Sequence, residues 1–198
     1  MPLNVALIEP RIPPNTGNIA RLCAAADTPL HLIGPLGFSL DEKQVRRAGL
    51  DYWDKTDLWV HDNWFAFRDA ISRDRCLYFS ANAEQDYRRA PFRANSVLIF
   101  GNETDGLPAR ILEKHPERCY RIPMPGDVRS LNLANAVSVV LYEGLRTLDI
   151  ALPAGVVAAD ADADADADEG VNGNTIAPPV KKQASRRGGR GRSKRAAS

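Results

Sequence analysis

The chain has 198 residues, of which 44% are hydrophobic and 26% charged, a balance typical of a globular protein with one sizeable core. Its three cysteines, Cys23, Cys76 and Cys119, are far apart and odd in number, which argues against a disulfide framework and against a CxxC metal or redox motif. No stretch approaches the roughly 18 consecutive apolar residues of a membrane span, and the N-terminus lacks the pattern of a signal peptide. We therefore expect a soluble, cytoplasmic protein that binds neither metal nor membrane.

The composition changes at about residue 150. Residues 1–149 carry 18 Lys or Arg and 19 Asp or Glu, whereas the eight bases and six acids that remain are segregated. The acids lie between Asp160 and Glu169, within an Ala-Asp repeat, and the bases lie between Lys181 and Arg195. Ala and Asp are both depleted in strands, and the acids repel one another, so we predict a domain of residues 1–150 and a disordered tail of residues 151–198. The basic tract is of a kind that binds nucleic acid loosely, or it only solubilises the chain and folds back on the acids.

Short apolar runs alternate with segments of helical periodicity along residues 3–148. Strands are expected at Leu3–Glu9, Leu30–Gly34, Arg75–Ala81, Ser96–Gly101 and Cys119–Pro123. Helices are expected at Asn15–Asp27, Asp41–Ala48, Asn63–Ser72, Leu107–His115 and from Leu131 onward. This alternation predicts an α/β domain with a mostly parallel sheet and helices on both faces, whose ligand site lies beyond the carboxyl ends of the strands.

The first polar loop is "EPRIPPNTGNIAR", residues 9–21. Asn15, Thr16 and Asn18 lie at the predicted start of a helix, where such side chains usually serve as N-caps. A capping role leaves Arg21 unexplained, because Arg21 lies about one and a half turns beyond Asn15. Its fork of donors could reach the same end of the helix and bind a phosphate or a carboxylate.

The second loop is "FGNETDGLP", which directly follows an apolar strand. Gly101 permits close backbone approach to a ligand, and Gly106 permits a turn conformation that other residues resist. The loop is neither a P-loop nor a GxGxxG dinucleotide motif. Glu103 is either a surface charge or a functional group.

The third loop, "RIPMPGDVRSLN", leads into an almost unbroken apolar helix. It sets Asp127, Arg129, Ser130 and Asn132 at the start of a segment built for burial. Burial of an unpaired polar group costs about 1 to 3 kcal/mol, so these side chains either cap the helix or face a ligand that pairs with them.

In this order and spacing the three loops resemble the motifs of the SPOUT class of RNA ribose 2′-O-methyltransferases. The match is closest to the small tRNA (cytidine/uridine-34 2′-O)-methyltransferases, also through "KQVRRAGLDY" at residues 43–52, and it covers residues 3 to about 148. The resemblance implies a deep trefoil knot formed by the chain from about Val97 onward. It also implies S-adenosylmethionine as cofactor, tRNA as substrate and a homodimer.

The resemblance also implies roles for individual residues. Residues that match the family's catalytic positions are Asn15, Arg21, Glu103, Ser130 and Asn132. Residues that match its cofactor site are Phe79, Gly101, Ile122, Ser130 and Leu131. Arg21 is the family's candidate for activating the ribose hydroxyl, but a guanidinium, with a pKa above about 12, is a poor base, so it could instead orient the hydroxyl and hold a phosphate. Tyr142 would lie at a dimer interface or pack in the core.

The last helix is apolar on more than one face, which favours a homodimer. The sequence departs from the commonest family pattern at Asn102, where proline is frequent, and at Val128, where serine is common. These departures bear more on the substrate than on the reaction. Two alternatives therefore stay open: a 2′-O-methyltransferase acting at another tRNA or ribosomal RNA position, and a knotted RNA-binding protein without catalysis.

Overall fold

The computed structural model describes residues 3–40, 55–149 and 181–182. The helix predicted at Asp41–Ala48, the motif at residues 43–52 and nearly all of the tail lie outside the described residues. No helix of the described part is long and apolar enough to cross a membrane. The described part also contains no group of three or more His, Cys, Asp or Glu side chains placed to hold a metal ion.

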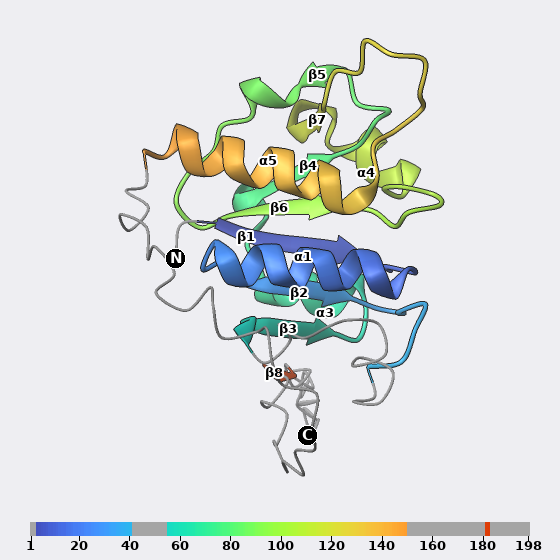
Figure 1. The fold of residues 1–198 in the computed structure, drawn as a ribbon, viewed down its shortest axis with the longest axis vertical. Helices are drawn as coiled ribbons and strands as arrows, with labels where there is room; N and C mark the ends of the chain where they lie inside the picture. The colour runs from blue at the N-terminus through green and yellow to red at the C-terminus, as the bar shows by residue number, and fades with distance from the viewer. Residues whose placement is uncertain (1–2, 41–54, 150–180, 183–198) are drawn as a thin grey trace, which may run out of the picture.

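A parallel sheet forms the centre of the molecule (Figure 1). Its strands are β1 (Leu3–Ile8), β2 (Leu30–Ile33), β3 (Leu58–His61), β4 (Cys76–Phe79), β5 (Gln85–Asp86), β6 (Ser96–Phe100), β7 (Cys119–Arg121) and β8 (Lys181–Lys182). They lie in the order β5-β7-β4-β6-β1-β2-β3-β8, and every neighbouring pair is parallel. The predicted mostly parallel sheet is thus confirmed.

Within the described residues, four α-helices cover the two faces of this sheet. They are α1 (Pro13–Ala25), α3 (Trp64–Ala70), α4 (Ala109–Lys114) and α5 (Leu133–Thr147). The helices α1 and α5 lie side by side on one face, while α3 and α4 pack on the other (Figure 1). Helices on both faces were predicted, and this part of the prediction is confirmed.

Three short strands were missed by the sequence interpretation: β3, β5 and β8. Two of them, β5 and β8, consist of two polar residues each and therefore carry no apolar signal. The strand β8 consists of Lys181 and Lys182, in the tail, where the sequence predicts no regular structure. The last helix begins at Leu133 rather than Leu131. Asn132 is its N-cap, because the Asn132 side chain accepts a hydrogen bond from the Ala134 N–H.

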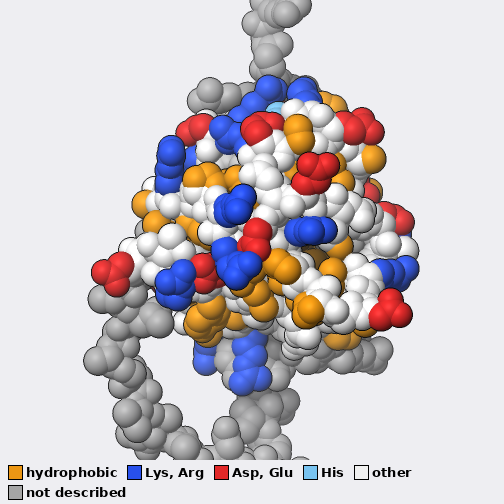
Figure 2. All heavy atoms as spheres, turned by 90° about the horizontal axis from the view of Figure 1, so that it is seen from above, with side chains coloured by type: hydrophobic (Ala, Val, Ile, Leu, Met, Phe, Trp, Pro, Cys, Tyr) orange, Lys and Arg blue, Asp and Glu red, His pale blue; other side chains and the backbone are white. Residues whose placement is uncertain are grey.

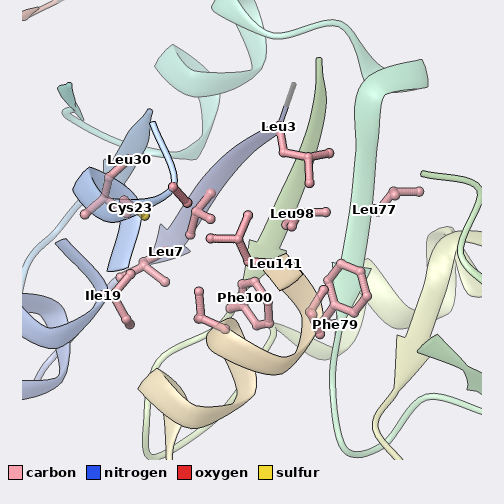
Figure 3. Packing of buried hydrophobic residues seen from close by; sticks show 14 of the residues in the cluster. Leu3, Leu7, Ile19, Cys23, Leu30, Leu77, Phe79, Leu98, Phe100 and Leu141 are labelled. Atoms are coloured by element: carbon pink, nitrogen blue, oxygen red, sulfur yellow. The ribbon is translucent and has the colours of Figure 1, made fainter. Parts of the chain in front are cut away.

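The core has two layers, one on each face of the sheet. All six residues of β1 are buried, and they alternate between the layers. Leu3 and Leu7 face α1 and α5, where they meet Ile19, Leu98 and Leu141 (Figure 3). Ala6 and Ile8 face α3 and α4. Burial on both faces explains why the central strands read as continuous apolar runs rather than alternating ones.

A polar cluster is buried under α3. The Nδ1 atom of His31 lies 3.1 Å from Nε2 of His61, and Nε2 of His31 lies 3.4 Å from Oδ1 of Asn4. The Asn4 oxygen only accepts, so Nε2 of His31 carries the hydrogen and its Nδ1 accepts from His61. Phe67 contacts both rings edge-on. Burial, together with the neighbouring His61, lowers the pKa of His31 to about 3, and burial also lowers the pKa of His61.

We predict that acid destabilises the protein through this cluster. An unfolded histidine has a pKa of about 6.5, so as the pH falls below that value the unfolded chain binds protons that buried His31 does not bind until about pH 3. Between pH 7.5 and 5.0 His31 alone should lower the free energy of unfolding by about 2 kcal/mol. Urea unfolding of the wild type and of His31→Gln at both pH values measures this difference. His115→Gln, at a ring that is 21% exposed, is the control and should alter the pH dependence less.

Candidate functional site

A cavity of about 660 Å³ opens at the carboxyl ends of β4, β6 and β7. All three polar loops contribute to its wall. Residues from the start of α1 are Ile12 and Asn15, those after β4 are Ser80, Ala81 and Asn82, and those after β6 run from Gly101 to Leu107. The remaining wall is formed by Phe79, Phe100, Tyr120, Ile122, Met124, residues 128–133 and Ala136. This is the position that a parallel sheet predicts for a ligand site.

The Glu103 carboxylate holds the start of α1. Its oxygens accept hydrogen bonds from the Arg11 N–H at 2.9 Å, the Ile12 N–H at 3.2 Å and the Asn15 side-chain amide at 3.2 Å. Arg11 and Ile12 directly precede α1, whose first two residues are prolines without an N–H, and the helix dipole favours a negative charge at this end. The second loop thus supplies the cap that α1 lacks.

The prediction that Asn15, Thr16 or Asn18 caps α1 by its side chain is therefore wrong. The helix begins at Pro13 behind an extended Ile12, and its N-cap residue makes no side-chain hydrogen bond. Pro13 favours this start, because proline fits the first helical turn, where its missing N–H is no loss. Asn15 lies inside the first turn and is buried.

Asn15 also connects α1 to α5. Its Oδ1 atom accepts a hydrogen bond of 3.0 Å from the Asn132 side-chain amide, while Oδ1 of Asn132 accepts from the Ala134 N–H at 2.9 Å. The Asn15 amide thus donates to the Glu103 carboxylate, and the Asn132 amide donates to the Asn15 oxygen. We call this the Glu103–Asn15–Asn132 network. This network joins all three sequence motifs in one site.

The second loop is held in shape from within. Oδ1 of Asn102 accepts from the Thr104 and Asp105 N–H groups, and the Gly106 N–H donates to the Asn102 carbonyl oxygen. Gly106 has a φ of 70°, in the region that favours glycine. A Cβ atom on Gly101 would lie 1.9 Å from the carbonyl carbon of Gly106. Gly101 thus allows the loop to fold back on itself. The sequence predicts that Gly101 lets a ligand approach the backbone, whereas the group that approaches it here is the Gly106 backbone.

An ion pair gives a second link between the first two loops. The Arg11 guanidinium lies 2.6 Å from the Asp105 carboxylate, and the two side chains are 44% and 60% exposed. At such exposure the pair contributes little to stability, on the order of 0.2 to 1 kcal/mol. It adds to the Glu103 hydrogen bonds rather than replacing them.

The polar residues at the start of α5 divide into two groups. Asn132 caps the helix, as one interpretation of the sequence required. Asp127, Arg129 and Ser130 are exposed, and Arg129 and Ser130 line the cavity. Arg129 and Ser130 therefore lie where a ligand would bind.

The structure brings together all but one of the predicted site residues. Those that line the cavity are Asn15, Phe79, Gly101, Ile122, Glu103, Ser130, Leu131 and Asn132. Arg21 does not line it: it is exposed on α1, six residues or about 9 Å along the helix from Asn15. The sequence interpretation missed Asn82, Leu107 and Tyr120, which only the packing of the strand ends brings to the wall.

The comparisons with known proteins agree with this geometry. The model of the SpoU rRNA Methylase family matches residues 2–142, which is well over half of the chain. The chain belongs to this family. Curated relatives include a tRNA (cytidine(34)-2'-O)-methyltransferase of Yersinia pestis, 49% identical over 152 residues, covering 74% of this chain and 94% of the relative. The Escherichia coli (strain K12) protein of the same name is 48% identical over 147 residues, with the same two coverages.

Solved structures of the SpoU family have the same fold. One, described as "Structural insights into the 2-OH methylation of C/U34 on tRNA", is 48% identical, with a TM-score of 0.69, and the match covers 75% of this chain and 91% of that one. The SpoU methyltransferase AviRb from Streptomyces viridochromogenes, in complex with the cofactor AdoMet, is 25% identical, with a TM-score of 0.64. That match covers 74% of this chain and 57% of AviRb.

We predict that Glu103→Ala weakens both the fold and the site. Loss of the carboxylate leaves the N–H groups of Arg11 and Ile12 and the Asn15 side-chain amide without their acceptor at the positive end of the helix dipole, which should lower the free energy of unfolding by about 1 to 2 kcal/mol. Urea unfolding measures the effect. Glu113→Ala, at an exposed position on α4, is the matched control and should change stability by less than about 0.5 kcal/mol. Equal stability of the two variants would show that the carboxylate is not needed as a cap.

Proposed function

We propose that this chain is an S-adenosylmethionine-dependent methyltransferase that modifies the 2′-hydroxyl of the ribose at position 34 of tRNA, in the cytoplasm. The observation that carries the proposal is the Glu103–Asn15–Asn132 network, which joins the three motifs around one cavity. The proposal is supported by the names of relatives that share almost half of their residues with this chain over nearly their whole length.

The wall of the cavity fits the cofactor in its chemistry. Phe79, Phe100 and Tyr120 give one part of it an aromatic, buried lining that suits an adenine ring. Thr104 and Ser130 provide polar groups elsewhere in the wall. We assign cofactor binding to Phe79, Gly101, Ile122, Ser130 and Leu131. When bound, S-adenosylmethionine supplies a methyl group on a positively charged sulfur.

The protein's own contribution is chiefly positioning. The titratable side chains that line the cavity are Glu103, Asp105, Tyr120 and Arg129, and none of the described lining residues is a histidine or a lysine. Glu103 is occupied by three donors and Asp105 by Arg11, so neither is free to act as a general base. Methyl transfer to a hydroxyl requires in-line geometry, which orientation within the site can supply.

We assign the catalytic positions accordingly. Glu103 and Asn15 act as positioning residues, because they fix the start of α1 and, through Asn132, the start of α5. Ser130, exposed at the cavity wall, contacts ribose or cofactor. Arg21 is exposed on α1 outside the cavity wall, so we assign it to a phosphate of the RNA next to the ribose rather than to the hydroxyl that enters the cavity.

We further propose that the C-terminal third forms the deep trefoil knot of the SPOUT class. The strand order supports this: β7 lies beyond β4, between β4 and β5, whereas α5, which follows β7 in the chain, returns to pack on β1 and β6. The long connection between β7 and α5 contributes the third loop of the site.

The RNA position is the open part of the proposal. The family description names ribosomal RNA, whereas the relatives' names specify tRNA. Incubating the purified chain with labelled S-adenosylmethionine and either tRNA or ribosomal RNA, followed by nucleoside mass spectrometry, separates these substrates. Cofactor binding without product on either RNA would contradict the enzyme assignment, and RNA binding without cofactor binding would favour a non-catalytic RNA-binding protein.

We predict that Arg21→Ala removes most methyl transfer but leaves the affinity for S-adenosylmethionine within about threefold. The reason is that Arg21 lies outside the cavity wall and is assigned to the RNA. Calorimetry measures cofactor binding, and transfer to tRNA measures activity. Arg110→Ala, which removes another exposed arginine on α4, is the control and should retain activity. A parallel loss of cofactor affinity and activity in Arg21→Ala would place the arginine at the cofactor instead.

We also propose a homodimer formed through α5. Its buried side, with Val137, Leu141 and Leu145, packs on the sheet, while Val139 and Tyr142 are 37% and 48% exposed on its outer side.

We predict that Val139→Asp yields a monomer, because a carboxylate cannot be buried unpaired in an apolar interface. Light scattering at micromolar concentration measures the mass. Phe65→Asp, at an exposed position on α3 on the opposite face, is the control and should keep the dimer. A monomeric wild type that is fully active would contradict the proposal.

A further inference from the structure

Exposed apolar side chains gather at the mouth of the cavity. Large hydrophobic side chains that are exposed in the described part of the chain are Ile12, Phe65, Val128, Leu131, Val139 and Tyr142. Three of them line the cavity: Val128 is 62% exposed, Ile12 43% and Leu131 37%. We call Ile12, Val128 and Leu131 the apolar rim. Isolated exposed apolar residues need no explanation, but three around one opening indicate a contact surface.

The backbone holds the apolar rim in place. The Ile12 N–H is bound by the Glu103 carboxylate, and the Val128 N–H donates to the Gly126 carbonyl oxygen at 3.0 Å in a tight turn. Leu131 directly precedes Asn132, whose side chain caps α5. All three side chains therefore sit on backbone that the site's own hydrogen bonds fix, which makes the rim a pre-formed surface.

The cavity has two different ends. Its closed end is formed by side chains that are at most 5% exposed, namely Phe79, Phe100, Leu107 and Tyr120. Its open end is formed by the apolar rim, of which Leu131 is shared with the residues assigned to the cofactor. A small cofactor can occupy the closed end, so the group that receives the methyl must come from the open end, and a macromolecular substrate contacts the rim on entering.

The charges beside the rim fit a nucleotide. Arg129, next to Val128, is exposed, lines the cavity and makes no ion pair within the described part of the chain. Arg11 is paired with Asp105, and Asp127 is exposed on the other side of Val128. Elsewhere, on the face shown in Figure 2, basic and acidic side chains are interspersed. An apolar platform beside an arginine matches a base and its phosphate.

We propose that the apolar rim binds the nucleobase attached to the ribose that is methylated, with Arg129 on an adjoining phosphate. Val128, the most exposed member, is then a specificity-determining residue: it contacts the base, while the ribose hydroxyl reaches the cavity. This inference rests on the proposed function, because it takes the substrate to be RNA.

The experiment compares two RNA ligands and two proteins. One ligand is a tRNA anticodon stem-loop with cytidine at position 34, and the other carries at that position a ribose with hydrogen in place of the base. The affinity of the wild type and of Val128→Ser for each is measured in the presence of S-adenosylhomocysteine. The Kd for the cytidine ligand should rise about fivefold in Val128→Ser, whereas the Kd for the ligand without the base should not change.

Two further variants sharpen the test. Phe65→Ser removes a still more exposed apolar side chain, on α3 and away from the cavity, and should change neither Kd. Arg129→Ala should weaken both ligands equally and reduce the dependence of affinity on salt concentration, because a phosphate contact does not depend on the base.

Several outcomes would overturn the inference. Equal weakening of both ligands by Val128→Ser would show a contact to the backbone instead, and weaker S-adenosylhomocysteine binding would make Val128 part of the cofactor wall. A shift from dimer to monomer would show that a second subunit covers the rim. The proposed function is tested separately by methyl transfer with the wild type: its failure would be seen as absence of product, whereas failure of this inference would be seen in the binding and mass measurements on Val128→Ser while the wild type still forms product.

Discussion

The carboxylate of Glu103 at the start of α1 is the contact on which the site depends. The helix α1 begins with two prolines, which have no N–H, and its N-cap residue Ile12 makes no side-chain hydrogen bond, so the N–H groups just before the helix are bound from another loop. The carboxylate binds two backbone N–H groups and the Asn15 amide at once, in the field of the helix dipole. Asn15 can then orient Asn132, and Asn132 caps α5. One charged group thereby positions two helices and the loop between β6 and α4.

The parallel sheet makes this contact possible. In such a sheet the carboxyl ends of all strands meet at one edge, so the loops after β1, β4, β6 and β7 converge although they are far apart in the chain. The two helices that share the network also share one face of the sheet (Figure 1). The same α5 that carries Asn132 at its start exposes Val139 and Tyr142 along its outer side. In the proposed dimer, the interface and the active site would therefore be mechanically connected through a single helix.

The chemistry proposed for the cavity suits a site that is rigid and poor in bases. An activated methyl donor makes the transfer favourable, so the protein must chiefly align two reactants and exclude other encounters. The Glu103 network and the internal turn of the second loop provide that rigidity. The open end of the cavity, with its apolar rim and Arg129, provides the contacts that distinguish one RNA nucleotide from another. Reaction and specificity are thus assigned to different parts of the same cavity.

The sequence by itself determined the class of the fold and most members of the site. The apolar runs at β1, β4 and β6 predict buried parallel strands, and the resemblance of the three polar loops to a known family's motifs implies that Asn15, Glu103, Ser130 and Asn132 belong to one site. What only the tertiary structure decided is how these residues act on one another. A cap for α1 was expected from within the helix, but it comes from Glu103, because a capping carboxylate need be close only in space. The location of Arg21 outside the cavity wall, the apolar rim and the short strands β3 and β5 likewise depend on packing between distant segments, which local periodicity does not contain.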